Sequence, residues 1–254
     1  MNDHDPDISS SAGRTNSPER QTPVTQTLDW NDGDMPYSRE FGDHFYCQTD
    51  GRLECGHTFL TGNGLPERWS QPVSPESDFL IGELGFGTGL NFCETWRQWK
   101  LFRQPGARLH FMSFELFPMQ RDEIDRALAR WPEIDAERKA FAAIWPDQPT
   151  GHVVLELDDQ TKLTVVCDPA LDGVTAAKAG FDAWFLDGFA PSRNPAMWSP
   201  ELMQALYDKT SPGGTFGTYA AAGFVRRNLQ AAGFTVERRP GFAGKREMLC
   251  GKRG

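Results

Sequence analysis

Three glycines at alternate positions, Gly85, Gly87 and Gly89, are the residues in this sequence whose spacing is most suggestive of chemistry. The apolar run Phe79–Ile81 precedes them, and a helical pattern begins at Leu90. Glycines let the backbone turn sharply and let a ligand approach the main chain, because no Cβ is in the way. A strand that ends in such a turn before a helix builds a nucleotide-type pocket at the carboxyl edge of a parallel sheet. We therefore expect this loop to hold a nucleotide-like ligand.

The glycine spacing distinguishes two kinds of nucleotide-like ligand. The dinucleotide fingerprint G-x-G-x-x-G places pyrophosphate on a helix N-terminus, but Leu90 stands where its third glycine belongs. The pattern G-x-G-x-G, with Glu83 two residues before it, resembles motif I of the S-adenosylmethionine-dependent methyltransferases. In that family the loop packs against the amino-acid part of a cofactor without phosphate, and the resemblance implies that Glu83 accepts from its ammonium group. The structural alternative is a glycine-rich turn with no ligand.

Acidic residues also end two neighbouring strands of the expected sheet. Glu115 follows the run Leu109–Phe114, and a carboxylate at that position of a doubly wound fold can accept from both ribose hydroxyls. Asp168 follows the run Leu163–Cys167, where an acid faces the adenine amino group or caps a helix that begins at Pro169. The plainer alternative for Glu115 is an ordinary exposed glutamate.

A fourth acid lies in the segment Asp182–Trp198, beside a loop of restricted backbone. A short apolar strand ends in Asp187, the chain turns on Gly188, and the loop that follows contains Pro191, Asn194, Pro195 and Trp198. A carboxylate at this edge can hold an incoming amine by a charge-assisted hydrogen bond. We therefore expect Asp187 to be the catalytic residue and to contact the cofactor. The alternative is an aspartate that only caps the turn.

The elements that must position these residues alternate between strands and helices. We expect strands over residues 78–84, 109–114, 153–157, 162–166, 183–186 and 214–219, helices over 90–102, 119–131, 136–144, 200–209 and 223–232, and a closing hairpin over 234–238 and 247–251. This alternation implies right-handed crossovers and a mostly parallel sheet. The predicted fold class is α/β, a Rossmann-like S-adenosylmethionine-dependent methyltransferase fold with a terminal antiparallel hairpin.

The residues before this pattern form two predicted regions. Residues 1–26 are rich in Ser, Thr, Pro, Asp and Asn and lack an apolar period, which predicts a disordered tail. Residues 27–77 contain short β-like runs broken by Asp50-Gly51 and Asn63-Gly64, which predicts a small β-rich extension. The methyltransferase domain is then expected over residues 78–254.

Composition excludes several classes of protein. The chain has 254 residues, and no apolar run in it approaches the roughly 18 residues of a membrane span. The N-terminus lacks a secretory pattern, and neither the five cysteines nor the five histidines have metal-ligand spacing. We expect a cytoplasmic protein with reduced thiols, no membrane partner and no metal.

Positive charge gathers at one end of an otherwise acidic chain. The formal net charge is −9, yet residues 222–254 carry eight basic and two acidic residues, a net +6. A local basic face can hold a phosphate backbone whatever the total charge is. A solvated basic edge without a partner is the plainer alternative.

Longer blocks make the family resemblance specific. They are Phe59-Leu60 with Asn63-Gly64-Leu65-Pro66-Glu67-Arg68, Glu83–Phe92, Phe114–Pro118, Asp182–Trp198, Ala222–Arg227 with Ala232–Phe234, and Gly244–Gly251. Together they are similar to the MnmC-type tRNA (5-methylaminomethyl-2-thiouridine) methyltransferase domain over nearly all of residues 28–254. One departure is Phe45-Tyr46-Cys47, where the family has a Tyr-Phe-Ser-like segment.

This resemblance implies methyl transfer from S-adenosylmethionine to the amine of 5-aminomethyl(-2-thio)uridine at the tRNA wobble position. It implies an anticodon stem-loop partner and a stand-alone (MnmD-like) domain without the flavin oxidase domain, so that a separate enzyme supplies the aminomethyl precursor. The cofactor residues implied are Asn63, Glu83, Gly85, Gly87, Thr88, Gly89, Asn91, Glu115, Asp168 and Asp187. The residues expected to meet the substrate or RNA are Phe189, Asn194, Trp198, Tyr219, Arg226, Arg227, Lys245 and Arg246. The alternatives are a methyl- or aminopropyl-transferase for a small amine, and a non-catalytic RNA-binding module.

Overall fold

The computed structural model of the protein describes residues 26–72, 77–178 and 180–254. The predicted disordered tail, residues 1–26, lies outside the described residues except for Gln26. The domain boundary predicted after residue 77 follows residues 73–76, which also lie outside, and it stays a prediction.

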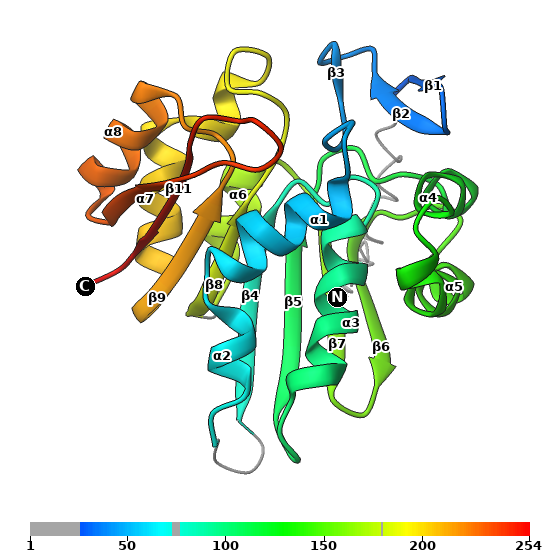
Figure 1. Ribbon diagram of the computed structural model, residues 1–254, viewed down its shortest axis with the longest axis horizontal. Coiled ribbons are helices and arrows are strands. Elements are labelled where there is room, and N and C mark those ends of the chain that lie inside the picture. The colour runs from blue at the N-terminus through cyan, green and yellow to red at the C-terminus, as the bar shows by residue number, and fades with distance from the viewer. Residues whose placement is uncertain (1–25, 73–76, 179) are drawn as a thin grey trace, which may run out of the picture.

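An eight-stranded sheet forms the centre of the protein (Figure 1). The strand order is β10-β11-β9-β8-β4-β5-β7-β6, and the five strands from β9 to β7 run parallel. Their bounds are β4 (Asp78–Leu84), β5 (Arg108–Phe114), β6 (Gly151–Asp158), β7 (Thr161–Cys167), β8 (Phe181–Leu186), β9 (Thr210–Thr218), β10 (Thr235–Arg239) and β11 (Met248–Lys252). Strands β6, β10 and β11 pair antiparallel. The predicted mostly parallel sheet with a terminal antiparallel hairpin is therefore confirmed.

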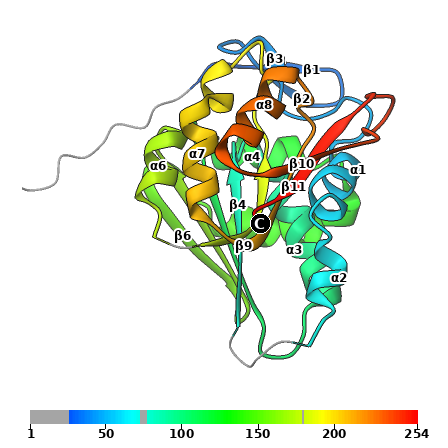
Figure 2. The same cartoon turned by 90° about the vertical axis from the view of Figure 1, so that its left-hand side faces the viewer.

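Helices cover both faces of this sheet, which explains the continuous apolar runs of its central strands. Figure 2 shows α6, α7 and α8 on one side of the sheet and α1, α2 and α3 on the other. The helices are α1 (Gly51–Cys55), α2 (Leu65–Trp69), α3 (Leu90–Phe102), α4 (Arg121–Leu128), α5 (Asp135–Ile144), α6 (Ala170–Ala176), α7 (Pro200–Lys209) and α8 (Gly223–Ala232), with 3₁₀ turns over Pro132–Ile134 and Pro195–Trp198. Two large buried apolar clusters fill the two interfaces.

Local signals in the sequence explain where several of these elements begin and end. The Ser199 hydroxyl accepts from the Leu202 N–H and caps α7, whose first residue is Pro200. Gly233, with φ +114°, ends α8 in a left-handed conformation. The strand β4 and the helices α3, α7 and α8 have the predicted bounds.

The region before the central sheet is only partly β-rich. Strands β1 (Leu28–Asn31), β2 (Met35–Ser38) and β3 (Asp43–His44) form a small antiparallel sheet near the carboxyl ends of the parallel strands (Figure 1). Residues 51–61 and 65–69 are helical, through α1, a π-helical segment (Gly56–Thr61) and α2, so the β structure expected around Phe59 is wrong. Cys55 and Phe59 are four residues apart and both lie in the core cluster beside α3, a helical spacing that short β-like runs concealed.

The order of the parallel strands fixes where a ligand can bind. The chain leaves β4 for β5 on one side and later returns to β8 on the other side. In open α/β sheets ligands bind outside the carboxyl ends of the strands where the direction of winding reverses. In this protein that crevice lies between the ends of β4 and β8, where the glycine loop and Asp187 are attached.

Candidate active site

A cavity of about 400 Å³ lies at this crevice, within the range of small-molecule sites. The ends of β4, β5, β8 and β9 contribute to it, together with the segment after β3, helix α1 and the loop of the C-terminal hairpin. Its lining is Asp43, His44, Phe45, Tyr46, Cys47, Gln48, Gly51, Glu54, Cys55, Phe59, Gly85, Phe86, Gly87, Thr88, Leu90, Asn91, Glu115, Asp187, Gly188, Phe189, Ala190, Tyr219 and Lys245. Strand ends far apart in the sequence therefore surround one cavity.

The glycine loop forms the floor in a conformation that requires glycine. Gly85 and Gly87 have φ values of +78° and +53°, and both line the cavity. A Cβ on Gly87 would lie 3.1 Å from the Phe45 ring, and one on Gly85 would lie 3.3 Å from the Gly188 backbone. A side chain at either position would be strained by its φ and would crowd the cavity wall.

Glu115 connects the floor to the end of β5. Its Oε2 accepts from the Gly87 N–H at 2.9 Å, and its Oε1 accepts from the Phe117 N–H at 2.8 Å. Burial raises the pKa of the Glu115 carboxyl, although these backbone N–H groups oppose that shift. Each carboxylate oxygen keeps a second lone pair for a ligand hydroxyl, as expected from the sequence for ribose.

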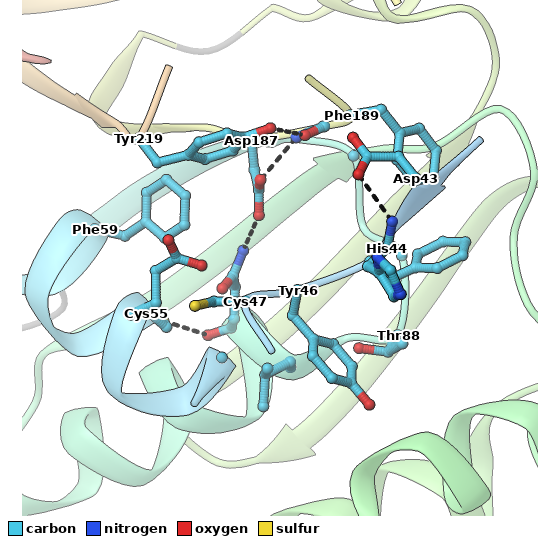
Figure 3. A pocket seen from close by; sticks show the side chains of 18 of the residues that line it. Asp43, His44, Tyr46, Cys47, Cys55, Phe59, Thr88, Asp187, Phe189 and Tyr219 are labelled. Atoms are coloured by element: carbon cyan, nitrogen blue, oxygen red, sulfur yellow. Dashed lines mark hydrogen bonds between the residues drawn. The ribbon is translucent and has the colours of Figure 1, made fainter. Parts of the chain in front are cut away.

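Asp187 points into the cavity from the end of β8 (Figure 3). Its Oδ1 accepts from the Gly188 N–H at 2.8 Å, and its Oδ2 accepts from the Asn91 side-chain amide at 2.7 Å. Burial raises the pKa of Asp187 to about 7, with these two hydrogen bonds acting in the opposite direction. An acid that titrates near neutral pH can take either protonation state at little cost.

Tyr219, Lys245 and Glu54 form the wall above Asp187. The Tyr219 hydroxyl donates to the Gly188 carbonyl, and the Lys245 ammonium lies 4.3 Å from the centroid of the Tyr219 ring. Lys245 also donates to Glu54 on α1 at 2.5 Å. The C-terminal hairpin is thus joined to α1 across the cavity.

The N-terminal segment closes the opposite wall. Asp43 accepts from the Ala190 N–H at 3.0 Å, which ties β3 to the loop after Asp187. Phe189 stacks on Phe41 with a centroid separation of 4.5 Å and meets Phe45 edge-on at 5.1 Å. This wall of the cavity is therefore aromatic.

Charge within the cavity favours a cation. Four carboxyl side chains and one ammonium line it: Asp43, Glu54, Glu115, Asp187 and Lys245. An excess of one sign focuses the field in a cleft and attracts the opposite sign. A positively charged sulfonium and a protonated amine both fit such a cavity, whereas a pyrophosphate does not.

Several predicted cofactor residues lie outside the cavity lining. The side chain of Asn63 is buried and joins Phe59 and Trp184 carbonyls to the Thr215 hydroxyl. Gly89 lies below the floor, where a Cβ would meet Phe86 and Phe141, and its left-handed φ begins α3. Glu83 is fully buried beneath Asn91, and Asp168 is not among the lining residues. This placement therefore does not support a direct contact between Glu83 and the cofactor ammonium.

The predicted substrate residues also separate into two groups. Phe189, Tyr219 and Lys245 line the cavity, whereas Asn194, Trp198, Arg226, Arg227 and Arg246 do not. Trp198 is fully buried under the loop and its indole N–H donates to the Phe189 carbonyl at 3.3 Å. The expected stacking of Trp198 on a base is wrong, because the ring has no open face.

Sequence reasoning missed much of the lining between residues 43 and 59. Asp43, Glu54 and Phe59 carry no glycine loop or strand-end signal, and only their tertiary position brings them to the cavity. Two signals were available, the block containing Phe59 and the segment Phe45-Tyr46-Cys47, because both were compared with the family.

The profile of a family described as S-adenosyl-L-methionine-dependent methyltransferase matches residues 132–254 of the chain. The description of this family names S-adenosylmethionine, the expected cofactor, and the acidic lining of the cavity fits its positive charge.

Two curated proteins and one solved structure are similar to the chain. It is 42% identical over 228 residues to the tRNA 5-methylaminomethyl-2-thiouridine biosynthesis bifunctional protein MnmC of Chromohalobacter salexigens, covering 89% of this chain and 32% of that protein. It is 40% identical over 225 residues to the MnmC protein of Stutzerimonas stutzeri, covering 88% and 34%. The chain thus spans about a third of the length of these relatives. The crystal structure of MnmC2 from Aquifex aeolicus shares the fold, with a TM-score of 0.70 at 18% identity over 92% of this chain and 72% of that one.

Among the described residues, no helix is long and apolar enough to cross a membrane. The same residues contain no group of three or more His, Cys, Asp or Glu side chains placed to hold a metal ion. All five cysteines are described, and each of them is unpaired.

Proposed function

We propose that the chain methylates the amine of 5-aminomethyl(-2-thio)uridine at the tRNA wobble position and gives 5-methylaminomethyl(-2-thio)uridine. The observation that carries this proposal is the Asp187 carboxyl, held by Asn91 and Gly188 at the end of β8 inside an acidic cavity with an aromatic wall. The names of the two MnmC relatives support a tRNA acceptor.

The residues of the cavity suit the needs of methyl transfer to an amine. When bound, S-adenosylmethionine supplies an electrophilic methyl group on a positively charged sulfur. The N–C bond forms as the S–C bond breaks, and the extra proton then leaves the nitrogen. Holding two reactants in line can lower a barrier by about 7–11 kcal/mol, so positioning is the main task of the protein.

Asp187 is suited to position the acceptor. Its ionised form can accept a hydrogen bond from the amine and stabilise the positive charge that grows on nitrogen. A pKa of about 7 also lets the same carboxyl take up the proton that the amine must lose. Tyr219 and Phe189 form apolar surface on which a flipped-out base can rest.

The same chemistry indicates where the precursor comes from, which residues contact the RNA and which compartment is favoured. The chain has a place for one methyl transfer, so a separate enzyme or domain must supply the aminomethyl precursor. The target uridine belongs to the anticodon stem-loop, and Arg226, Arg227 and Arg246 are our candidates for contacts with its phosphates. A tRNA acceptor and unpaired cysteines both favour the cytoplasm.

The decisive experiment follows tritiated methyl from S-adenosylmethionine into tRNA from cells that lack this gene. We expect labelling by the wild-type protein and a loss on the order of 100-fold or more in Asp187→Ala. Asp172→Ala, at an exposed acid on α6, is the matched control and should label normally. Unchanged turnover of Asp187→Ala would refute the role of Asp187.

Two rival functions give different results in the same assay. If the label enters polyamines and not tRNA, the chain is a transferase for small amines. If tRNA binds but no acceptor is labelled, the chain is a non-catalytic RNA-binding module.

A further inference from the structure

One amide nitrogen holds two carboxyl groups at the floor of the cavity. The Nδ2 of Asn91 donates to Oδ2 of Asp187 at 2.7 Å and to Oε1 of Glu83 at 3.0 Å. An amide nitrogen has two hydrogens, so these two contacts use its full donor capacity. Glu83 therefore fixes the orientation of the Asn91 amide. The same amide nitrogen then donates to Asp187 on the cavity side.

Glu83 has the surroundings of a neutral acid. Its side chain is fully buried in β4, and its Oε2 lies 2.6 Å from the hydroxyl of Ser113 on β5. Burial raises the pKa of Glu83 well above its usual range, and the charge of Asp187 adds to this shift. The Ser113 hydroxyl donates to Glu83 Oε2, and this hydrogen bond opposes the upward shift of the Glu83 pKa.

We propose that Glu83 and Asn91 are positioning residues for Asp187, and this inference rests on the proposed function. Glu83 fixes the Asn91 amide with its nitrogen toward Asp187, and this donor sets the orientation of the reactive carboxylate. Glu83, the acid before the glycine loop, then helps to orient the acceptor amine through Asn91 and Asp187. It does not bind the cofactor ammonium, because Asn91 lies between it and the cavity.

Other charged groups also face Asp187 and must be kept constant in any test. Glu54 on α1 raises its pKa and Lys245 on the hairpin lowers it. Tyr219 after β9 and Cys55 on α1 lie near enough to feel its charge, and both keep their protons because burial raises the pKa of each.

Two variants separate positioning from cofactor binding. Glu83→Gln reproduces the neutral acid, since its Oε1 can accept from Asn91 and its amide can donate to Ser113. We expect an unchanged Kd for S-adenosylmethionine in this variant. A clear loss of cofactor affinity in Glu83→Gln would overturn the proposal in favour of a charged Glu83 at the ammonium group.

Asn91→Ala removes the donor while keeping a good helix former at the start of α3. Losing a hydrogen bond to the charged form should raise the Asp187 midpoint in the pH profile of kcat/KM by about one pH unit. Activity at pH 7 should fall about fivefold and recover as the pH is raised, which simple misfolding would not produce. A lower plateau with an unchanged midpoint would overturn the proposal.

A measurement without substrate keeps this inference separate from the proposed function. Carbon-13 NMR of the Asp187 carboxyl in the free protein should give a higher midpoint in Asn91→Ala than in wild type, and the wild-type midpoint in Glu83→Gln. Equal midpoints in all three proteins would refute the positioning role, whatever the acceptor proves to be. If tRNA is not labelled but the midpoints shift as expected, only the proposed function fails.

Discussion

The Nζ of Lys245 lies 2.5 Å from Oε1 of Glu54, so the loop between β10 and β11 is tied to α1 over the cavity. The side chain of Lys245 is 39% exposed and that of Glu54 is 10% exposed, which places the bond at the boundary between cavity and solvent. Within this ion pair, Glu54 raises the pKa of Asp187 and Lys245 lowers it, so the two charges act in opposite directions. The pairing makes Lys245 part of the cavity wall.

Breaking this pair from either side should move the Asp187 midpoint in opposite directions. Lys245→Met leaves Glu54 as an unpaired negative charge, so the midpoint in the pH profile of kcat/KM should rise. Glu54→Gln leaves Lys245 unpaired, so the midpoint should fall, in each case by no more than about one pH unit. The double variant should return close to the wild-type midpoint, because both charges are then absent. Shifts in the same direction would contradict this assignment.

Cofactor affinity should rise with pH. In the free protein burial keeps Asp187 protonated below a pKa of about 7, whereas a bound cation favours the ionised form. Binding of S-adenosylmethionine therefore releases a proton, and its Kd should fall as the pH is raised toward 7 and level off above it. S-adenosylhomocysteine, which lacks the sulfonium charge, should show a weaker dependence. Calorimetry from pH 5.5 to 8.5 measures the Kd of both ligands. An identical pH dependence for the two ligands would contradict the coupling between the sulfonium charge and the ionisation of Asp187.

Gly85→Ala should weaken cofactor binding more than it weakens the fold. Its φ of +78° should cost an alanine about 1–2 kcal/mol in unfolding free energy. The added Cβ would also lie 3.3 Å from the Gly188 backbone, which forms the cavity wall. Gly213→Ala is the matched control, because Gly213 has φ +75° and open space around it. Denaturation should show similar losses for both variants, and calorimetry should show lost affinity for Gly85→Ala alone.

Trp198 should contribute to stability and Phe189 to acceptor binding. Trp198→Ala removes a fully buried ring and should lower the free energy of unfolding by about 3–5 kcal/mol. Phe189 is half-buried in the cavity lining, so Phe189→Ala should cost less stability and should raise KM for the tRNA acceptor. Urea denaturation and steady-state kinetics distinguish the two. A normal stability for Trp198→Ala would contradict the packing role of its ring.

The basic residues near the end of the chain should determine the salt dependence of tRNA binding. Neutralising Arg226, Arg227 and Arg246 together should weaken tRNA binding and reduce the slope of log K against log salt concentration, since each phosphate contact releases counterions. The matched control replaces Arg238 and Arg239, which already pair with Glu247 and Glu237 on the edge hairpin. An equal loss in the control would show that total charge matters and that no particular face binds RNA.

Residue patterns along the chain were sufficient to predict most of the fold. β4, α3, α7 and α8 have the predicted bounds, because buried apolar runs, a serine cap and a C-terminal glycine act over a few neighbouring residues. The helical segments over residues 51–61 and 65–69 escaped prediction. Their short runs satisfy both strand and helix patterns, and packing against α3 decides between them.

The sequence by itself determined which residues stand at the ends of the parallel strands: the glycine loop, Glu115 and Asp187. These positions follow from alternation along the chain, and the parallel arrangement brings them to one edge. Only the tertiary structure decided that Glu83 is buried under Asn91 and that Asp43 and Glu54 enter the cavity. Burial and contacts between distant segments depend on how the whole chain packs, and local sequence carries little information about them.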